Sequence, residues 1–337
     1  MSAIPLHRRL LYAALTPALL VLLAEGVCRL GWSADEAALN PALSYLSDHP
    51  TLGWTLRPNM VDYTTADGMS LTTNSLGIRD APIADPAPAT RILSMGESTT
   101  WGHGVDAEQT YSERLQARLQ ADGHDAEVVN AGIGAWTIWQ SYVFLTEYGR
   151  ELAPDVVMLY HLHNDSLPRG VRDQNNYLIE VPHTDRELYV RRWPYRHVLW
   201  GLYQSRLYLL LRKRLLQMPS ELPDAGTFEQ TEGPPQVRVP MADRQIALEG
   251  IAAVCQSLGA ELVVLMPLYR RHPGRDHVLS DFARNTGAAY IDLPAYKRAE
   301  DIADEGFYLD PVHPSAEGHA HIARWIHGEF SDAPWLY

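Results

Sequence analysis

The sequence predicts an α/β protein built in three α/β/α layers around a five-stranded parallel sheet. Five short apolar runs, RILSM, EVVN, DVVMLY, ELVVLM and AYIDL, lie between residues 91 and 293 and alternate with segments of helical period. Such runs are typical of strands buried on both faces, which occur in parallel sheets covered by crossover helices. A length of 337 residues with 46% hydrophobic residues allows one large domain of this kind with appendages.

The amino-terminal segment 1–30 predicts a membrane anchor or a signal segment. Basic residues at positions 7–9 precede a charge-free stretch, Leu10–Ala24, which Glu25 and Arg29 close. Its fifteen residues are fewer than the roughly 20 that span a bilayer as a helix, and they match the upper limit of a signal-peptide core. A buried first helix of a cytosolic domain is the alternative.

We favour an uncleaved anchor, because Ala24-Glu25-Gly26 is a poor site for signal-peptide cleavage. The basic residues before the segment and the acidic pair Asp35-Glu36 after it predict a cytoplasmic amino terminus. The expected localisation is a single amino-terminal pass through the membrane, with the bulk of the chain outside the cytoplasm and, in a bacterium, in the periplasm.

Residues 31–90 form an extension that we expect to pack on the catalytic domain. Aromatic and β-branched residues occur throughout it, whereas a linker would be a polar tract. Asp67-Gly68 lies between two alternating runs and predicts a hairpin with a two-residue turn.

The catalytic domain is predicted to span residues 91–337, and its helices follow from capping signals and apolar spacing. Thr110 and Glu113 form a capping-box start for one helix, and Gly259 suits the end of another. Further helices are predicted from about residue 137 to 150, around Phe282, and from about residue 315 to 330.

Polar clusters follow the first three strands and precede the last helix. They are Gly96-Glu97-Ser98, Asn130–Ala135, His161–Asp165 and Asp310–His313. Open α/β sheets bind their ligands at the carboxyl ends of the strands. We therefore expect four segments that are distant in sequence to converge on one crevice.

The chemistry of these clusters indicates nucleophilic catalysis. A serine hydroxyl is a weak nucleophile unless a base accepts its proton, and a carboxylate must orient that base. Asp310 and His313 supply the acid and the base within one turn, and Ser98 is the candidate nucleophile. The oxyanion of an acyl-transfer intermediate needs preorganised donors, and the candidates are the Ser98 amide, an amide of the glycine loop after the second strand, and the Asn164 side chain.

These motifs resemble those of the SGNH or GDSL hydrolases, esterases with a flavodoxin-like α/β/α fold. GESTTWG is similar to their first block, NAGIGAWT to the second, HNDS to the third and YLDPVHPSAEGH to the last, and the resemblance covers about residues 92–330 apart from one insertion. It implies that Ser98 is the nucleophile, Asp310 the acid, His313 the base and Asn164 the side-chain oxyanion donor.

The sequence departs from the family pattern at three positions. Glu97 stands where aspartate is usual, and Leu162 stands where the third block commonly has glycine. The glycine of the second block falls on Ala135, with Gly132 and Gly134 nearby, so the amide of any of the three is a candidate oxyanion donor, with Gly134 and Ala135 preferred. Four further residues are candidate substrate contacts: Glu97, Trp136, His163 and Asp165.

Two other types of site are compatible with parts of the same motifs. A phosphate loop is disfavoured, because Gly96 and Gly102 are one residue too far apart and His103 replaces the lysine. His161, His163 and Asp165 could form a metal site, but a hydrogen-bonded cluster in the crevice is the preferred interpretation. We expect no metal and no cofactor.

The insertion at residues 166–240 lacks the strand–helix period and is predicted to be a lid. Its segment 188–216 contains seven Arg or Lys, no acidic residue, and several Trp and Tyr among leucines. In a chain of net charge −13, this basic segment could lie on an anionic membrane or bind an acidic glycan, or its helices could pack while its arginines are solvated.

The sequence therefore predicts a serine esterase anchored to the membrane that acts on short acyl esters. The net charge of −13 argues against a nucleic-acid partner. The upstream motif NSLGIR and the amino-terminal anchor resemble the amino-terminal parts of membrane-anchored bacterial members of the family. By analogy, this resemblance suggests O-acetyl groups of cell-envelope carbohydrate as substrates. The alternatives are an O-acyltransferase that uses the same triad and a weakly catalytic glycan-binding or scaffold protein. The sequence identifies no protein partner.

Overall fold

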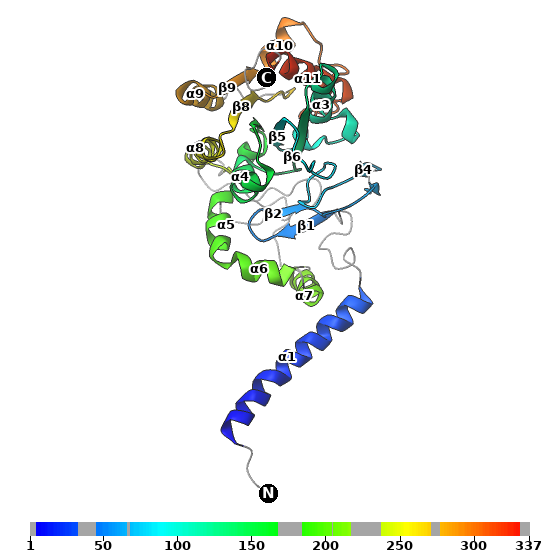
Figure 1. Cartoon of the computed structure of the whole chain (residues 1–337), viewed down its shortest axis with the longest axis vertical. Helices are drawn as coiled ribbons and strands as arrows, with labels where there is room; N and C mark the ends of the chain where they lie inside the picture. The colour runs from blue at the N-terminus through cyan, green and yellow to red at the C-terminus, as the bar shows by residue number, and fades with distance from the viewer. Residues whose placement is uncertain are drawn as a thin grey trace, which may run out of the picture. The chain divides into compact units, whose positions relative to one another are not determined.

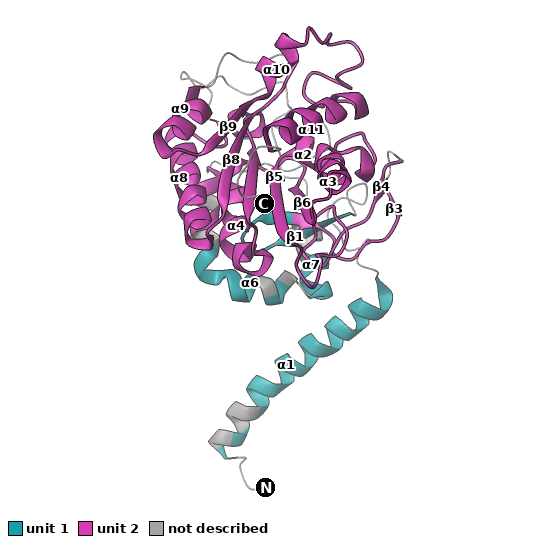
Figure 2. Cartoon of the chain, turned by 45° about the horizontal axis from the view of Figure 1, so that its top comes forward, with its two compact units in different colours: residues 1–54, 192–232 teal, residues 55–191, 233–337 magenta. Residues whose placement is uncertain are grey.

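The computed structural model describes residues 5–32, 45–65, 68–167, 184–203, 205–216, 237–270 and 277–330. The chain divides into two compact units, coloured separately in Figure 2. One unit comprises residues 1–54 and 192–232, and the other comprises residues 55–191 and 233–337. These bounds differ from the predicted division into 1–30, 31–90 and 91–337, which stays a prediction, as does the lid at 166–240.

The larger unit contains the predicted parallel sheet. Its strands are β5 (Thr90–Gly96), β6 (Ala126–Gly132), β7 (Val156–Tyr160), β8 (Glu261–Met266) and β9 (Ala289–Asp292), in the order β6-β5-β7-β8-β9. Every neighbouring pair is parallel, and β5 and β7 are buried along their whole length. The predicted fold class is therefore confirmed.

The register of the three central strands sets the position of the polar clusters. Gly96 at the end of β5 pairs with Gly132 at the end of β6 and with Tyr160 at the end of β7. The segments that follow these three strands therefore leave the sheet at the same level and on the same edge.

Helices cover both faces of the sheet. The pair α3 (Tyr111–Ala121) and α11 (Ala316–Phe330) packs together on one side, and α4 (Ile138–Leu152) and α8 (Met241–Leu258) pack together on the other (Figures 1 and 2). The shorter elements are α2 (Ser98–Trp101), η2 (Ala107–Gln109), η3 (Asn164–Ser166), α9 (His277–Thr286) and α10 (Leu293–Ala299).

The predicted capping residues have the expected local roles. The Thr110 side chain accepts a hydrogen bond from the Glu113 amide at 3.3 Å, which satisfies a free amide of the first turn of α3. Gly259 ends α8 in the left-handed conformation, which glycine adopts without steric cost.

The extension contains the predicted hairpin, but its connection is longer than two residues. β3 (Tyr63–Thr64) pairs antiparallel with β4 (Ser70–Leu71). Thr65 also pairs with Met69, because its amide donates to the Met69 carbonyl and its side chain accepts from the Met69 amide. The strands are therefore joined by residues 65–69, and these extra bonds confine the reversal to residues 66–68, of which Asp67 lies outside the described residues.

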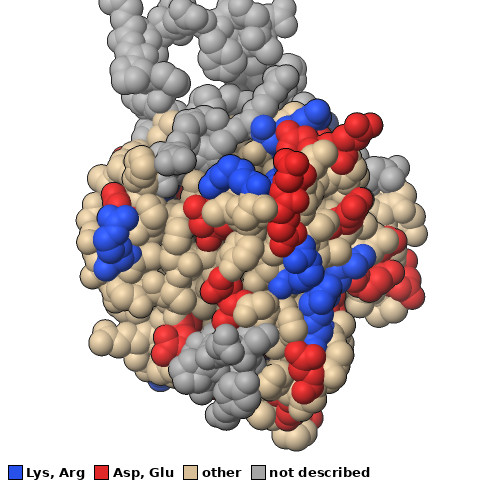
Figure 3. All heavy atoms as spheres, turned by 90° about the horizontal axis from the view of Figure 1, so that it is seen from above, with Lys and Arg blue, Asp and Glu red and all other residues tan. Residues whose placement is uncertain are grey.

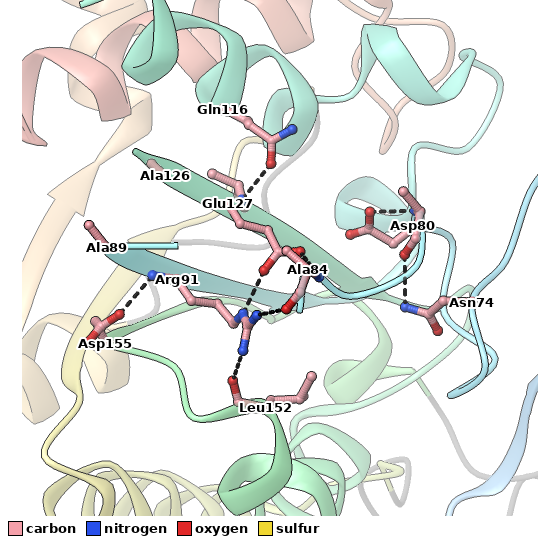
Figure 4. Close-up of polar contacts among 12 residues, drawn as sticks. Asn74, Asp80, Ala84, Ala89, Arg91, Gln116, Ala126, Glu127, Leu152 and Asp155 are labelled. Carbon is pink, nitrogen blue, oxygen red and sulfur yellow. Dashed lines mark hydrogen bonds and ion pairs between the residues drawn. The ribbon is translucent and has the colours of Figure 1, made fainter. Parts of the chain in front are cut away.

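Arg91 joins the start of β5 to three neighbouring segments (Figure 4). Its guanidinium donates to the Glu127 carboxylate of β6 at 2.6 Å, to the Leu152 carbonyl at the end of α4 at 2.7 Å, and to the Ala84 carbonyl at 2.8 Å. Its backbone amide donates to the Asp155 carboxylate at 2.7 Å. The extension, the sheet and α4 therefore meet at one buried cation.

The smaller unit contains α1 (Leu6–Gly31), β1 (Leu46–His49), the start of β2 (Gly53–Leu56), η4 (Trp193–Tyr195), α6 (Arg196–Tyr203) and α7 (Arg206–Leu216). A further helix, α5 (Asp185–Arg192), ends at its boundary. Among the described residues, α1 is the one helix long and apolar enough to cross a membrane, over Tyr12–Gly31. The length and composition of α1 are compatible with an anchor and equally with a signal sequence.

Charged side chains of both signs are mixed on the face shown in Figure 3, where basic groups have acidic neighbours. This distribution fits the acidic composition of the chain. Nucleic-acid binding requires a basic face that displaces counterions, so the described charges on this face do not favour such a partner.

We predict that Arg91→Met destabilises the protein by about 3 kcal/mol, because removing one partner of a buried ion pair leaves the other charge uncompensated. Urea unfolding of the purified chain measures the change. Arg284→Met is the matched control, since its exposed pair with Asp281 should contribute less than about 0.5 kcal/mol. Equal shifts for the two variants would contradict the role assigned to Arg91.

Candidate active site

Ser98 lies on a tight connection between β5 and α2. A Cβ on Gly96 would approach the Thr100 Oγ1 to 1.9 Å, and one on Gly132 would approach the Trp101 amide nitrogen to 2.3 Å. Only glycine fits at these two positions, because the end of β6 passes directly against the backbone of α2. The connection leaves Ser98 half-buried, whereas Thr99 and Thr100 are buried.

Three side chains form a continuous chain of hydrogen bonds at this point. The distance between the Ser98 Oγ and the His313 Nε2 is 2.7 Å, and that between the His313 Nδ1 and the Asp310 Oδ2 is also 2.7 Å. The second oxygen of Asp310 accepts the amides of Val312 and His313 at 2.7 and 2.8 Å. The carboxylate is therefore fixed by its own turn before it orients the imidazole.

The electrostatics of the pair suit a neutral imidazole beside a charged carboxylate. Burial lowers the pKa of His313 below its ordinary value, although the hydrogen bond that His313 donates to Asp310 opposes this shift. Burial raises the pKa of Asp310, but the hydrogen bonds that it accepts outweigh this and hold the pKa below its usual range. His313 is consequently available as a base at neutral pH.

Glu97 connects the turn that carries Ser98 to the segment after β7. Its carboxylate accepts the Asn164 amide at 2.9 Å, the His163 amide at 3.3 Å and the Tyr269 hydroxyl. The side chain is fully buried, and burial raises its pKa to about 7. Glu97 therefore binds protein groups rather than facing the crevice as a substrate contact.

Hydrogen bonds fix both the backbone and the side chain of Asn164. Its backbone amide binds Glu97, and its side-chain amide donates to the Trp136 carbonyl at 2.9 Å. An asparagine amide has two N–H groups, so this bond leaves one donor on the same nitrogen. Asn164 lies at the end of β7, on the same sheet edge as Ser98.

The loop after β6 has, at Ala135, a backbone conformation that favours glycine. Ala135 adopts a left-handed conformation with φ of 63°, where glycine has no steric cost. Arg238 donates to the Ala135 carbonyl at 2.8 Å and to Asp185 at 3.0 Å, which holds the loop. A Cβ on Gly134 would make only ordinary contacts with Trp101.

Two of the candidate substrate contacts are buried in the protein. The Trp136 ring is inaccessible and packs against Phe144, with 5.8 Å between ring centroids. Asp165 accepts the Ile138 amide at the start of α4 at 2.9 Å and lies 3.4 Å from Arg244. Both side chains therefore support the crevice from behind, which does not fit the contacts expected of them.

His163 is half-buried and lies beside Tyr269, with 5.7 Å between ring centroids. Burial lowers its pKa, and Asp310 is close enough to oppose that shift. Of the four candidate substrate contacts, His163 is the one whose position at the rim is compatible with that role.

The histidines of the alternative metal site do not converge. His161 is buried and bonds the Ser141 hydroxyl at 2.7 Å, and burial lowers its pKa to about 3. Among the described residues, the group whose ligand atoms lie within 4.8 Å of one another consists of His103, Asp310 and His313. Two of these already form the hydrogen-bonded chain to Ser98.

Sequence reasoning did not assign a role to His103 or Arg79. The His103 ring lies over His313, with 4.4 Å between ring centroids. Arg79, from the motif NSLGIR, is buried and donates to the carbonyls of Trp101, Gly102 and Val105 at 2.8 to 3.0 Å. It thereby fixes the turn that follows Ser98. The available signal in the sequence was that Arg79 is the one charged residue of the motif NSLGIR.

One family model matches most of the chain. The model of the GDSL-like Lipase/Acylhydrolase family matches residues 94–321. No curated protein matches the sequence.

Several solved structures resemble the fold. TesA is 17% identical, with coverage of 73% of this chain and 99% of TesA and a TM-score of 0.46. Axe2, an acetylxylan esterase from Geobacillus stearothermophilus, is 17% identical, with coverage of 74% and 96% and a TM-score of 0.45. The esterase EstA from Pseudoalteromonas sp. is 12% identical, with coverage of 72% and 97% and a TM-score of 0.45.

We predict that the hydrolysis of p-nitrophenyl acetate by the purified chain loses activity on the acid side with a pKa below 6.5, the ordinary value for histidine. Protonated His313 cannot accept the Ser98 proton, and burial shifts that protonation to lower pH. The pH dependence of kcat/KM measures this pKa.

His103→Ala tests the contribution of His103 to the lowered pKa of His313, which adds to that of burial. The neighbouring His103 lowers the pKa of His313, so its removal should move the acid limb to higher pH. An acid limb above pH 6.5 in the wild type, or one that moves to lower pH in the variant, would contradict the assignment.

Proposed function

Because this chain belongs to the GDSL-like lipase/acylhydrolase family and is an ester-cleaving hydrolase, we propose that it is a serine esterase whose nucleophile is Ser98. The observation that carries the proposal is the continuous hydrogen-bonded chain from Ser98 through His313 to Asp310, with both bonds at 2.7 Å. This arrangement supplies a nucleophile, a base within reach of its proton, and a carboxylate that fixes the tautomer of the base.

The proposed reaction proceeds through an acyl-enzyme. The His313 Nε2 accepts the hydroxyl proton as the Ser98 Oγ bonds to the ester carbonyl carbon. The tetrahedral intermediate then collapses, the bond to the alcohol oxygen breaks, and His313 gives the proton to the leaving alcohol. Water attacks the acyl-enzyme by the same route and yields the carboxylic acid and free Ser98.

The oxyanion is proposed to bind three donors. These are the Ser98 amide at the start of α2, the remaining side-chain N–H of Asn164, and an amide of Gly134 or Ala135. The support for Asn164 is that Glu97 and the Trp136 carbonyl hold it at the sheet edge beside Ser98. Donors fixed before the reaction stabilise developing charge without a reorganisation cost.

We assign a short acyl group, such as acetyl, carried on a larger alcohol such as an envelope carbohydrate. His103 lies against His313 and Ser98 is half-buried, which limits the space beside the nucleophile. The Asp310 side chain is 41% exposed, so the triad is close to the surface and a bulky alcohol can remain in solvent.

We also propose that α1 is retained as an anchor, with the amino terminus in the cytoplasm. Glu25 of α1 accepts hydrogen bonds from the backbone amides of Arg206 and Leu207. Cleavage beyond Gly26 would remove this carboxylate from α7, which supports retention of the segment. Basic residues before α1 and acidic residues after it support the orientation.

The test is labelling and turnover of the purified full chain with an organophosphonate and p-nitrophenyl acetate. Ser98→Ala should abolish labelling, and both Ser98→Ala and His313→Ala should lower kcat by roughly 10⁴-fold or more. Asn164→Ala should lower kcat by about 10² to 10³-fold while Ser98 still labels slowly.

Ser257→Ala is the matched control, because this exposed serine lies on α8 and bonds only the Val254 carbonyl of its own helix. It should label and turn over as the wild type does. Labelling of Ser98→Ala, or an unreactive wild type, would refute the serine mechanism.

A further inference from the structure

A glutamate on α1 caps a helix that is distant in the sequence. The Glu25 carboxylate accepts the backbone amides of Arg206 and Leu207 at 2.9 and 2.8 Å and the Ser205 hydroxyl at 2.7 Å. These amides belong to the first turn of α7, where backbone donors have no partner within the helix. A carboxylate at this end is also favoured by the helix dipole. All four residues belong to the smaller unit.

The position of Glu25 on α1 places the start of α7 at the end of the apolar stretch. Glu25 is the first charged residue after Leu10–Ala24 and forms an ion pair with Arg29 at 2.6 Å. Leu15 and the apolar residues at 19–23 are exposed on α1, as expected of a helix whose surroundings are lipid. If α1 crosses a bilayer, Glu25 lies near the boundary between hydrocarbon and headgroups, and it holds α7 at that boundary.

The segment that leads to α7 exposes an apolar stripe. Tyr195, Val198 and Leu202 are exposed and follow one another at spacings of three and four residues, which puts them on one face of η4 and α6. Leu211 on α7 is also exposed. Isolated apolar residues on a surface need no explanation, but a stripe at helical spacing indicates a face that contacts an apolar medium.

The charge of the same segment is opposite to that of the chain. Residues 188–216 contain seven Arg or Lys and no acidic residue, whereas the chain has a net charge of −13. Arg196 stacks on Trp193 at 4.0 Å from the ring centroid. Helices with exposed aliphatic and aromatic residues among basic ones are typical of segments that lie in the interface of an anionic bilayer.

We propose that η4, α6 and α7 form an interfacial platform, residues 193–203 and 205–216, that lies on the anionic surface of the membrane entered by α1. Glu25 joins the platform to the anchor. The inference rests on the proposed retention of α1 in the membrane. The aliphatic stripe and the attachment to α1 favour lipid over an acidic glycan, since a glycan would gain little from Val198, Leu202 or Leu211.

The experiment uses the full chain in nanodiscs of phosphatidylcholine, alone or mixed with phosphatidylglycerol. A nitroxide label is attached to Val198→Cys or to the control Val61→Cys, an exposed valine of the larger unit. The exposed fractions of the two valines are 63% and 75%, and both native cysteines are buried, so the introduced thiols react selectively. Power saturation measures the access of oxygen, which partitions into lipid, and of a water-soluble nickel complex.

At position 198 we expect the nickel complex to have severalfold less access, and oxygen more access, than at position 61. The difference between the two positions should be larger in the discs that contain phosphatidylglycerol. A water-like signal at position 198 in a disc-bound, active chain would overturn the proposal while leaving the esterase intact. Protection of position 198 by soluble polygalacturonate but not by lipid would overturn it in favour of an acidic glycan. A full chain, with α1 intact, that does not enter discs would refute the anchor, and the platform with it.

A second variant tests the link to the anchor. Glu25→Ala should increase the mobility of a label at Leu211→Cys in discs, because α7 loses the acceptor of its first-turn amides. The label at position 61 and the turnover of p-nitrophenyl acetate should not change. Unchanged mobility at position 211 would show that Glu25 does not hold the platform.

Discussion

The hydrogen bonds of the buried Glu97 carboxylate are the interaction on which the rest of the site depends. Glu97 directly precedes Ser98, and it binds the backbone of His163 and Asn164 at the end of a neighbouring strand. One carboxylate thereby fixes the distance between the nucleophile and the proposed oxyanion donor. The hydroxyl of Tyr269 binds the same carboxylate from the loop after β8. The Glu97 carboxylate thus accepts hydrogen bonds from the backbone amides of His163 and Asn164 and from the Tyr269 hydroxyl. Its role is therefore to position these groups.

Much of this arrangement follows from the sequence because it depends on local pattern and on the rules of parallel sheets. The five strands were recognisable as short apolar runs, and their register places Gly96, Gly132 and Tyr160 at the same level. The polar clusters that follow were therefore predictable as neighbours. Asp310 and His313 lie in one turn, so their pairing is also a local property. The resemblance to known esterases selected Asn164 among the candidate oxyanion donors, since no local signal distinguishes it from a turn residue.

The rest depends on contacts that have no local signature. Trp136 and Asp165 lie in motifs of the site, yet their side chains face the core and the start of α4, because burial decides the direction of a side chain within a loop. Arg79 stabilises the turn after Ser98 from the extension, and Glu25 caps α7 across 182 residues of sequence. The turn of the hairpin is one residue longer than predicted, because Thr65 pairs with Met69 and three residues lie between them, a register that the Asp-Gly pair does not reveal.

The most direct test of the account is a double-mutant cycle between Glu97→Gln and Asn164→Ala, measured as kcat for p-nitrophenyl acetate. Glutamine retains the size of the side chain but replaces one acceptor by a donor, so Asn164 should shift, and displacements of this kind lower rates by roughly 10²-fold. If Glu97 acts through Asn164, the second substitution should add little to the first, because residues that act as a unit are not additive. Full additivity, or a wild-type rate for Glu97→Gln, would contradict the central claim.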